Sequence, residues 1–260
     1  LVIVVVAILW SLAVKAVSQP DGGFGGTNFA NLQGFGARDL LDISVLDALS
    51  NSLRNALVST VVSLVVGTLV AWLLAHSRGR LAARVLEALF MLPLGTSTVV
   101  LGLGWLLFFA EPPLALRDSW LAVPLAQSVI ALPLVIRFAH SGFAQTDREL
   151  LDAAATDGAG SLKTFVSVEL PLVRSALLSA AAFAALVSLG EFGAASFLAF
   201  GDQATLPTEL YRLISRPGAQ NYGMAMAVAC IMAALSLAVV LALSGDQRSR
   251  TQRRTRRVAA

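Results

Sequence analysis

The sequence has 260 residues, of which 57% are hydrophobic and 13% are charged, and its formal net charge is +3. A soluble globule of this length needs more polar surface than these residues supply, so the composition excludes a protein that folds mainly in water. The apolar residues come in long blocks, which indicates a membrane protein organised as a series of spans.

Six apolar blocks are long enough, or nearly so, to cross about 30 Å of hydrocarbon as helices of roughly 20 residues. In chain order these blocks are residues 1–17, 53–75, 85–109, 120–139, 176–200 and 223–243. None shows the two-residue alternation of a barrel strand, so each is predicted to be a helix. The first block begins without Met or a basic region, and no clean A-x-A cleavage pattern follows it. We therefore interpret it as a truncated first span rather than a signal peptide.

Charged residues predict which loops are cytoplasmic, because short cytoplasmic loops collect Lys and Arg. Arginines are concentrated after the second block, at Arg78, Arg80 and Arg84, and in the C-terminal tail, at Arg248, Arg250, Arg253, Arg254, Arg256 and Arg257. The segment 18–50 has an acidic excess and is predicted to be external, with Asp21, Asp39, Asp42 and Asp47 against Arg38. Alternation across six spans then places both termini and the loop 141–174 in the cytoplasm. The segment 201–222 is predicted to be external, although Arg212 and Arg216 argue mildly against it.

The tail has no aromatic residues that would stack on bases. We therefore expect no nucleic-acid partner and interpret the tail as a topology anchor near anionic lipid.

The loop 141–174 has about 30 residues, more than most connections between helices. Thr146 and Glu149 match a capping box that predicts a helix starting at Asp147. The apolar face of this helix is formed by Leu150, Leu151, Ala154 and Ala155. Two glycines, Gly158 and Gly160, are predicted to end it.

A second short helix is expected after this break, with Ser161 as its cap, and Pro171 marks the return toward the fifth span. A helix lying on lipid would carry bulky aromatic residues on one face and basic residues on the other. The stretch from Asp152 to Gly158 has neither, and its small alanines allow close approach. The loop is therefore predicted to fit a groove in a partner protein.

The same residues carry a family resemblance. The string Asp152-Ala153-Ala154, then Gly158, then Val168-Glu169-Leu170-Pro171 resembles the EAA loop of permeases in binding-protein-dependent ABC importers. Three residues separate Ala154 from Gly158 and nine separate Gly158 from Val168, which fits the family spacing. Asp152 in place of the usual Glu and Val168 in place of the usual Ile are the departures. The resemblance covers about residues 53–243.

The resemblance implies an all-α polytopic membrane bundle of six transmembrane helices with the ABC importer permease (MetI-like) fold. Residues 1–50 would form a first helix and an external loop, residues 51–245 a five-helix core with its coupling loop, and residues 246–260 a basic tail. The residues expected to couple to an ATPase are Asp152, Ala153, Ala154, Asp157, Gly158, Leu170 and Pro171.

The resemblance also implies partners. These are two copies of an ABC ATPase subunit, an extracytoplasmic solute-binding protein and a second permease copy or homologous half, all at the bacterial inner membrane. ATP would be used by the partner subunit, and this chain is expected to bind no cofactor and to be no enzyme. It contains no G-x-x-x-x-G-K-[ST] phosphate loop.

Other strings look most like the permeases for ferric iron or thiamine: residues 92–98, 189–193 and 205–207. Glu191 is the one acidic side chain well inside a predicted span, where a carboxylate is costly unless it faces a cavity or a partner. It is expected either to line the path of a cationic solute or to make a structural hydrogen bond to another span. Gly95 and Ser97 in the third span are the other path candidates. Pro93 and Gly95 are expected either to break this span, as happens where helices line cavities, or only to kink it.

Two other functions compete. An ion-coupled secondary transporter of a small solute would predict inverted repeats, and no clear repeat is found. An intramembrane enzyme would need a nucleophile and its base facing each other, and Glu191 has no evident partner of that kind. His76 and His140 lack companions at metal-ligand spacing, so no metal site is predicted.

Overall fold

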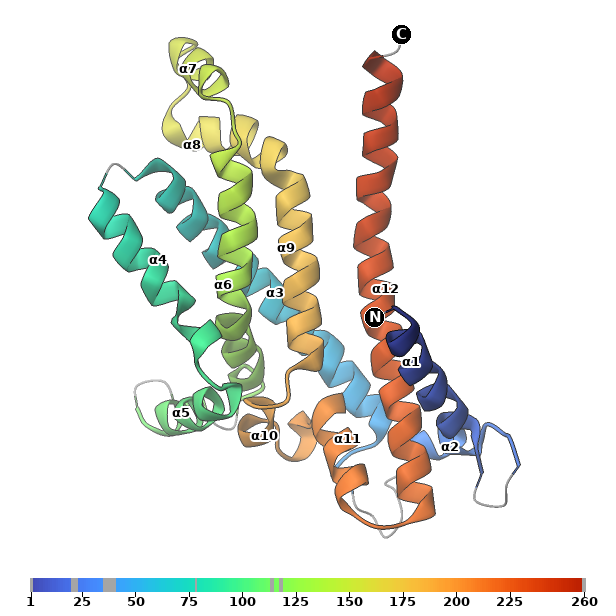
Figure 1. Ribbon diagram of the computed structural model, residues 1–260. Helices are drawn as coiled ribbons and strands as arrows, with labels where there is room; N and C mark the ends of the chain where they lie inside the picture. The colour runs from blue at the N-terminus through green and yellow to red at the C-terminus, as the bar shows by residue number, and fades with distance from the viewer. Residues whose placement is uncertain are drawn as a thin grey trace.

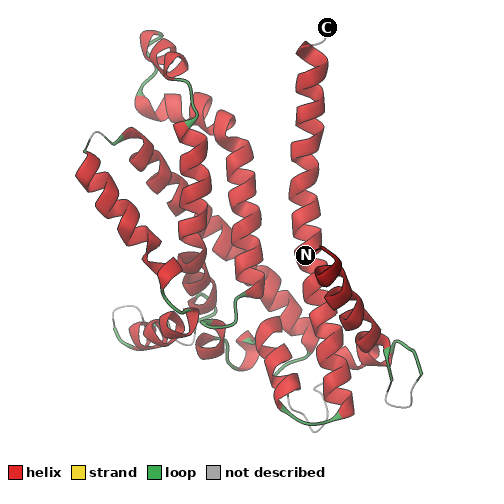
Figure 2. Ribbon diagram, in the orientation of Figure 1, coloured by secondary structure: helices red, strands yellow, loops and turns green. Residues whose placement is uncertain are grey.

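The computed structural model describes residues 2–19, 23–34, 41–77, 79–112, 115–116 and 119–258, except the side chains of Val2, Arg80, Arg148, Ala155 and residues 243–258. Within these ranges the elements are helices joined by loops (Figure 2). The predicted charges Asp21, Arg38, Asp39 and Arg78 lie outside the described residues, as do the side chains of Arg80 and the tail arginines.

Among the described residues, four helices are long and apolar enough to cross a membrane. They are α3 (Val45–His76), α6 (Ala122–Ala144), the helical run Ser161–Gly190 and the first part of α12 (Ala219–Val258). The run Ser161–Gly190 consists of α8 (Ser161–Thr164), the π-helical turn η2 (Phe165–Glu169) and α9 (Leu170–Gly190). The helical prediction is therefore confirmed for the second, fourth and sixth blocks and for residues 176–190 of the fifth.

The third predicted span is not one helix. It consists of α4 (Arg80–Gly95) and α5 (Thr98–Ala110), which are bent by 105° at the break between them. Pro93 lies in the last turn of α4 and cannot donate to the helical ladder, and Thr96 and Ser97 have extended backbones. Pro93 and Gly95 were expected either to break this span or only to kink it, and the bend lies at these residues. Its size was not predicted, because the hydropathy of the block is continuous.

The first predicted span is the short helix α1 (Val2–Val17), which packs along α12 (Figure 1). Its 16 residues rise about 24 Å, less than the thickness of the hydrocarbon. The short helices α2 (Thr27–Ala30) and η1 (Asn31–Gln33) follow it. Six spans were expected. The described residues form four helices long enough to cross a membrane, one bent pair of helices and one short apolar helix.

The fifth predicted span ends ten residues early. It was expected to reach Phe200, but α9 stops at Gly190 and the backbone of Glu191 is extended. The chain then forms three short elements: α10 (Ala195–Leu198), η3 (Gly201–Gln203) and α11 (Leu206–Ser215). Hydropathy did not separate them from the span because residues 194–200 are almost entirely apolar.

The centre of the bundle is formed by α3, α6 and α9. A β-carbon on Gly67 of α3 would lie 2.6 Å from the Val135 side chain of α6, so these two helices are in very close contact. Gln127 of α6 and Ser188 of α9 exchange two buried hydrogen bonds, of 3.2 and 2.5 Å. Small and mutually bonded polar residues are the means by which helices associate in lipid.

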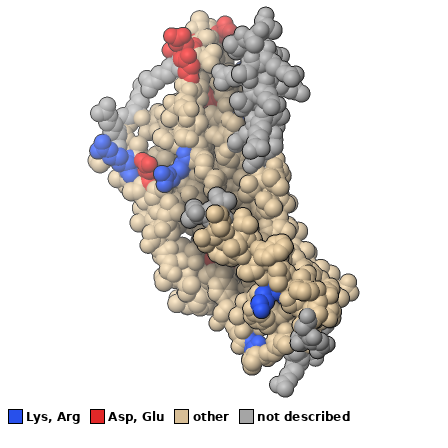
Figure 3. Space-filling model, turned by 45° about the vertical axis from the view of Figure 1, so that its right-hand side comes forward, with Lys and Arg blue, Asp and Glu red and all other residues tan. Residues whose placement is uncertain are grey.

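The two ends of the bundle differ in what they carry. The helix α7 (Arg148–Thr156), α8 and the C-terminus lie at one end, while α5, α10 and α11 lie at the other (Figure 1). In Figure 3 most of the charged side chains are near the two ends, with a broad uncharged band between them. This arrangement is the one expected of a protein whose middle faces lipid.

Candidate coupling loop

The loop predicted to couple to an ATPase, residues 141–174 and called the coupling loop below, includes α7, which follows α6 after a short turn. The predicted capping box is wrong by one residue: the Asp147 carboxylate accepts the N–H of Glu149 at 3.1 Å, and the Thr146 hydroxyl turns back toward Gly142 O. Asp and Thr are both good caps, so sequence did not decide between two adjacent candidates. The carboxylates of Glu149, Asp152 and Asp157 are exposed, which gives α7 an acidic surface.

Gly158 ends α7, as predicted. Its φ of +76° lies in the left-handed region, and the N–H of Ala159 bonds to Ala154 O at 3.0 Å, the long bond of a Schellman ending. Gly160, by contrast, has φ −68° and precedes α8. Ser161 was expected to cap the second helix, but it is the first residue of α8 and makes no capping hydrogen bond.

The motif residues fall into two groups. Asp152 and Ala153 are exposed on α7, Ala154 is half-buried, and Asp157 and Gly158 form its exposed end. Leu170 and Pro171 begin α9, where a missing proline N–H is tolerated. The loop therefore presents one short helix outward and re-enters the bundle at Pro171.

The path candidates meet at the other end of the bundle. Glu191 is not inside a span but at the end of α9, and it is 6% exposed. Its two oxygens accept the N–H groups of Ala194 and Ala195 at 2.8 and 3.0 Å, which caps α10. This is a structural bond within the following turn, neither of the two arrangements expected. This cap could not be predicted from the sequence, because the apolar residues continue past Gly190 and the end of α9 is not marked.

Gly95 and Ser97 are exposed at the bend between α4 and α5. The residue after Ser97 lies against the turn that Glu191 caps: a β-carbon on Gly193 would meet the Thr98 hydroxyl. The structure thus brings the three path candidates, Glu191, Gly95 and Ser97, to one region, where α5 packs against α10 and the turn that follows α9.

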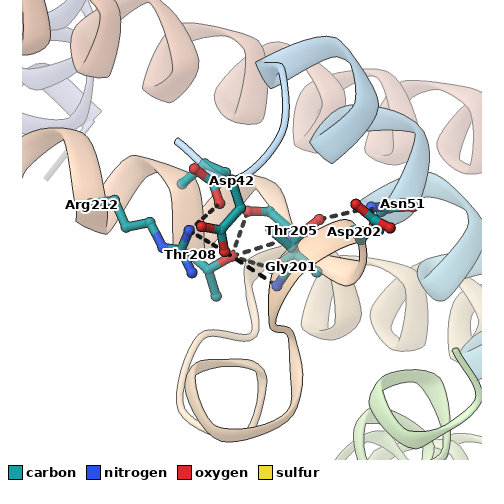
Figure 4. Close-up of polar contacts among 9 residues, drawn as sticks. Asp42, Asn51, Gly201, Asp202, Thr205, Thr208 and Arg212 are labelled. Atoms are coloured by element: carbon teal, nitrogen blue, oxygen red, sulfur yellow. Dashed lines mark hydrogen bonds and ion pairs between the residues drawn. The ribbon is translucent and has the colours of Figure 1, made fainter. Parts of the chain in front are cut away.

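A polar cluster that sequence did not predict joins the segment before α3 to α11 (Figure 4). Arg212 Nη1 lies 2.5 Å from Asp42 Oδ2 and 3.4 Å from Glu209 Oε1. Asp42 Oδ2 also accepts the N–H of Gly201, and Asn51 Nδ2 donates to the carbonyl oxygens of Asp202 and Ala204. Asp42 and Arg212 are 170 positions apart, too far for any spacing pattern to reveal their pairing.

Glu209 is fully buried in this cluster, and neither of its carboxylate oxygens accepts a hydrogen bond from the described residues. It belongs to α11, which is not among the candidate spans. Burial raises the pKa of Glu209 to about 7, Arg212 acts in the opposite direction, and Asp42 adds to the rise. Its charge is therefore sensitive to pH near neutrality.

A match over most of the sequence, including the bundle core, decides the family. Residues 63–248 match the family described as binding-protein-dependent transport system inner membrane component. The chain belongs to this family. The matched range contains the whole coupling loop and all of the candidate path residues.

Named transport-system permeases are similar to this inner membrane component. The molybdenum transport system permease protein ModB of Escherichia coli K12 is 33% identical over 138 residues, which are 52% of this chain and 58% of ModB. The sulfate transport system permease protein CysT of Salmonella typhimurium is 30% identical over 170 residues, 62% of this chain and 61% of CysT. The matched region thus spans about three fifths of each of these two relatives.

The fold of this inner membrane component is that of ABC transporter permeases. A chain in the crystal structure of a bacterial alginate ABC transporter, in complex with a periplasmic protein that holds an alginate pentasaccharide, superposes with a TM-score of 0.68. The superposition covers 96% of this chain and 94% of that chain, at 16% sequence identity. At this identity the likeness shows the fold alone, which confirms the predicted ABC permease architecture.

Proposed function

We propose that this chain is the membrane-spanning permease subunit of an ATP-driven importer and that a separate subunit hydrolyses ATP. The observation that carries the proposal is α7, an exposed acidic helix that ends at Gly158 within the matched family region. An exposed helix with small residues at one end of a membrane bundle is suited to a groove in a soluble partner. The acidic side chains on α7 favour a groove with basic residues.

The proposed assembly contains two copies of the ATPase subunit, a solute-binding protein outside the cell and a second permease copy or homologous half. In this assembly the α7 end of the bundle and both termini are cytoplasmic, in the bacterial inner membrane. Residues 51–245 form the permease core, residues 1–50 an added helix with an external loop, and residues 246–260 a cytoplasmic tail. The structure of the alginate transporter, which includes a periplasmic protein, supports this composition.

For the solute we propose a tetrahedral oxyanion, such as molybdate or sulfate, instead of the ferric iron or thiamine expected at first. Two observations support the change. The relatives described above belong to molybdenum and sulfate systems. In addition, the Glu191 carboxylate, which suggested a cationic solute, is buried and already accepts two backbone N–H groups.

Copurification of the ATPase subunit tests the permease assignment. Ala153 is exposed on α7, so Ala153→Arg should leave the bundle folded but prevent α7 from docking, with loss of most of the copurified ATPase. Ala82→Arg is the matched control, because Ala82 is exposed on α4, away from α7. Equal recovery of the ATPase with wild type and Ala153→Arg would contradict the proposed function.

The solute is tested separately by uptake of radiolabelled molybdate, sulfate and ferric iron by cells that express the complete importer. We expect the cells to take up an oxyanion, and we expect ferric iron not to compete with this uptake. Uptake of ferric iron alone would reject the oxyanion assignment and leave the permease assignment intact.

A further inference from the structure

A buried carboxylate lies where the coupling loop re-enters the bundle. Glu169, the last residue of η2, is 2% exposed. Its Oε2 accepts the indole N–H of Trp72 at 2.6 Å, and its Oε1 lies 3.0 Å from His76 Nε2. Both oxygens therefore contact side chains of α3, and a buried carboxylate with two such partners is held firmly in place.

The α3 side of this contact is itself fixed. His76 Nδ1 lies 3.0 Å from Trp72 O, one turn earlier in the same helix, and the two rings are in contact at 5.1 Å between centroids. The Trp72 ring also meets Phe165 edge-on at 5.5 Å, and Phe165 stacks on Phe143 of α6 at 6.2 Å. Side chains from α3, η2 and α6 thus form one cluster at the base of the coupling loop.

The π-helical turn places Glu169 in this cluster. The N–H of Leu170 bonds to Phe165 O, five residues back, and Pro171 has no N–H to continue a regular ladder. The turn is therefore wider than an α-helical one. The Glu169 side chain of this widened turn points into the protein and meets α3, while its neighbours in sequence are apolar.

Chain connectivity shows why this contact matters. The coupling loop is joined covalently to α6 at its start and to α9 at its end, but not to α3. A force applied to α7 and α8 reaches α6 and α9 through the backbone. It reaches α3, and from there α4, only across noncovalent contacts. Among the described residues, the polar contacts between the loop and α3 are those of Glu169 with Trp72 and His76.

We propose that Glu169 is a positioning residue that ties the coupling loop to the C-terminal end of α3. When an ATPase subunit displaces α7 and α8, Glu169 makes the end of α3 follow, so that the bent pair α4 and α5 receives the motion as well as α6 and α9. The inference rests on the proposed function of the chain as an ABC permease.

Distance measurements between spin labels test the tie. Labels replace Lys163 on α8 and Ser77 just after α3, both exposed, in a chain that carries Cys230→Ser, and the permease is reconstituted with its ATPase subunit. With the tie intact, the distance between the labels should be the same with and without ATP. In Glu169→Ala the distance should become broader and should shift by about 2 Å or more when ATP is added.

Two further variants distinguish a tie from a general packing role. Glu169→Gln retains an acceptor for Trp72 and a polar contact with His76, so it should restore the wild-type distance. Trp72→Phe removes the indole N–H but keeps a ring against Phe165. It should therefore broaden the distribution of label distances and make it depend on ATP, and it provides this test even if Glu169→Ala folds poorly. Glu87→Ala, at an exposed glutamate on α4, is the matched control and should behave as wild type.

The outcomes separate the two claims. If the ATPase binds the wild-type chain and both Glu169→Ala and Trp72→Phe keep its ATP-independent distance, the tie is overturned and the proposed function stands. If no ATPase binds the wild-type chain, the proposed function is wrong and the tie falls with it.

Discussion

The Glu209 carboxyl is a buried group whose protonation affects the α11 end of the molecule. Its pKa in the folded protein is raised from 4.5 to about 7 by burial. Between these pH values the unfolded chain has released the proton and the folded chain still holds it, so the free energy of unfolding falls as pH rises and levels off above pH 7. The folded protein tolerates the charge because Arg212 is near.

We predict that Glu209→Gln is more stable than wild type at pH 8 by about 1 kcal/mol or more, equivalent to roughly 2–4 °C in Tm, because the amide cannot ionise. At pH 5 the two proteins should have nearly the same Tm, since Glu209 is then neutral in the folded state. Thermal unfolding in detergent at both pH values measures this. Glu87→Gln, at an exposed site, should show no pH-dependent difference. A stabilisation that is equal at pH 5 and pH 8 would contradict the prediction.

At the scale of the element, α7 depends on how its last turn is closed. Gly158 has φ +76°, where a β-carbon is strained, and open space surrounds its α-carbon. We predict that Gly158→Ala costs about 1 kcal/mol and distorts the end of α7, which weakens ATPase binding by about fivefold. The measurement is the Kd of the ATPase subunit for the reconstituted permease.

Gly160 provides the matched control for this prediction. It lies two residues away, its φ is −68°, and open space also surrounds its α-carbon. Gly160→Ala should therefore bind the ATPase as wild type does. Equal loss in the two variants would mean that general flexibility of the loop, not the left-handed residue, governs docking.

Elements marked by a local pattern in the sequence could be predicted, while those set by contacts between distant residues could not. Apolar runs and the glycine at the end of α7 are local signals, and they correctly predicted four of the long helices and the end of α7. The break at Pro93 and Gly95 was anticipated, but its angle of 105° was not. The early end of α9 was missed, because the turn that Glu191 caps causes no change in hydropathy. The loop residues were found through their spacing, while the Trp72 and His76 partners of Glu169 were missed because they lie about 95 positions earlier.

At the scale of the whole molecule, charge placement and helix arrangement agree. Arg212 counted mildly against an external position for its segment, because arginine favours the cytoplasm. In the structure its charge is offset by Asp42 and Glu209, and α11 lies at the opposite end from α7 (Figure 1). An arginine that is paired with nearby carboxylates is therefore weaker evidence for a cytoplasmic position than an arginine counted from the sequence alone.

This arrangement predicts which cysteines a membrane-impermeant maleimide reaches in a chain that carries Cys230→Ser. Gln220 is exposed near the start of α12, at the α11 end, and Ser161 is exposed at the start of α8, at the α7 end. The run Ser161–Gly190 is long and apolar enough to cross the bilayer, while α10, η3 and α11, which lie between it and Gln220, are not, so we expect the two positions on opposite sides. Gln220→Cys should therefore be labelled in intact cells with a permeable outer membrane, and Ser161→Cys only after lysis. Labelling in the reverse order would place α7 outside the cell, where no ATP-hydrolysing subunit could reach it, and would contradict both the orientation and the proposed coupling.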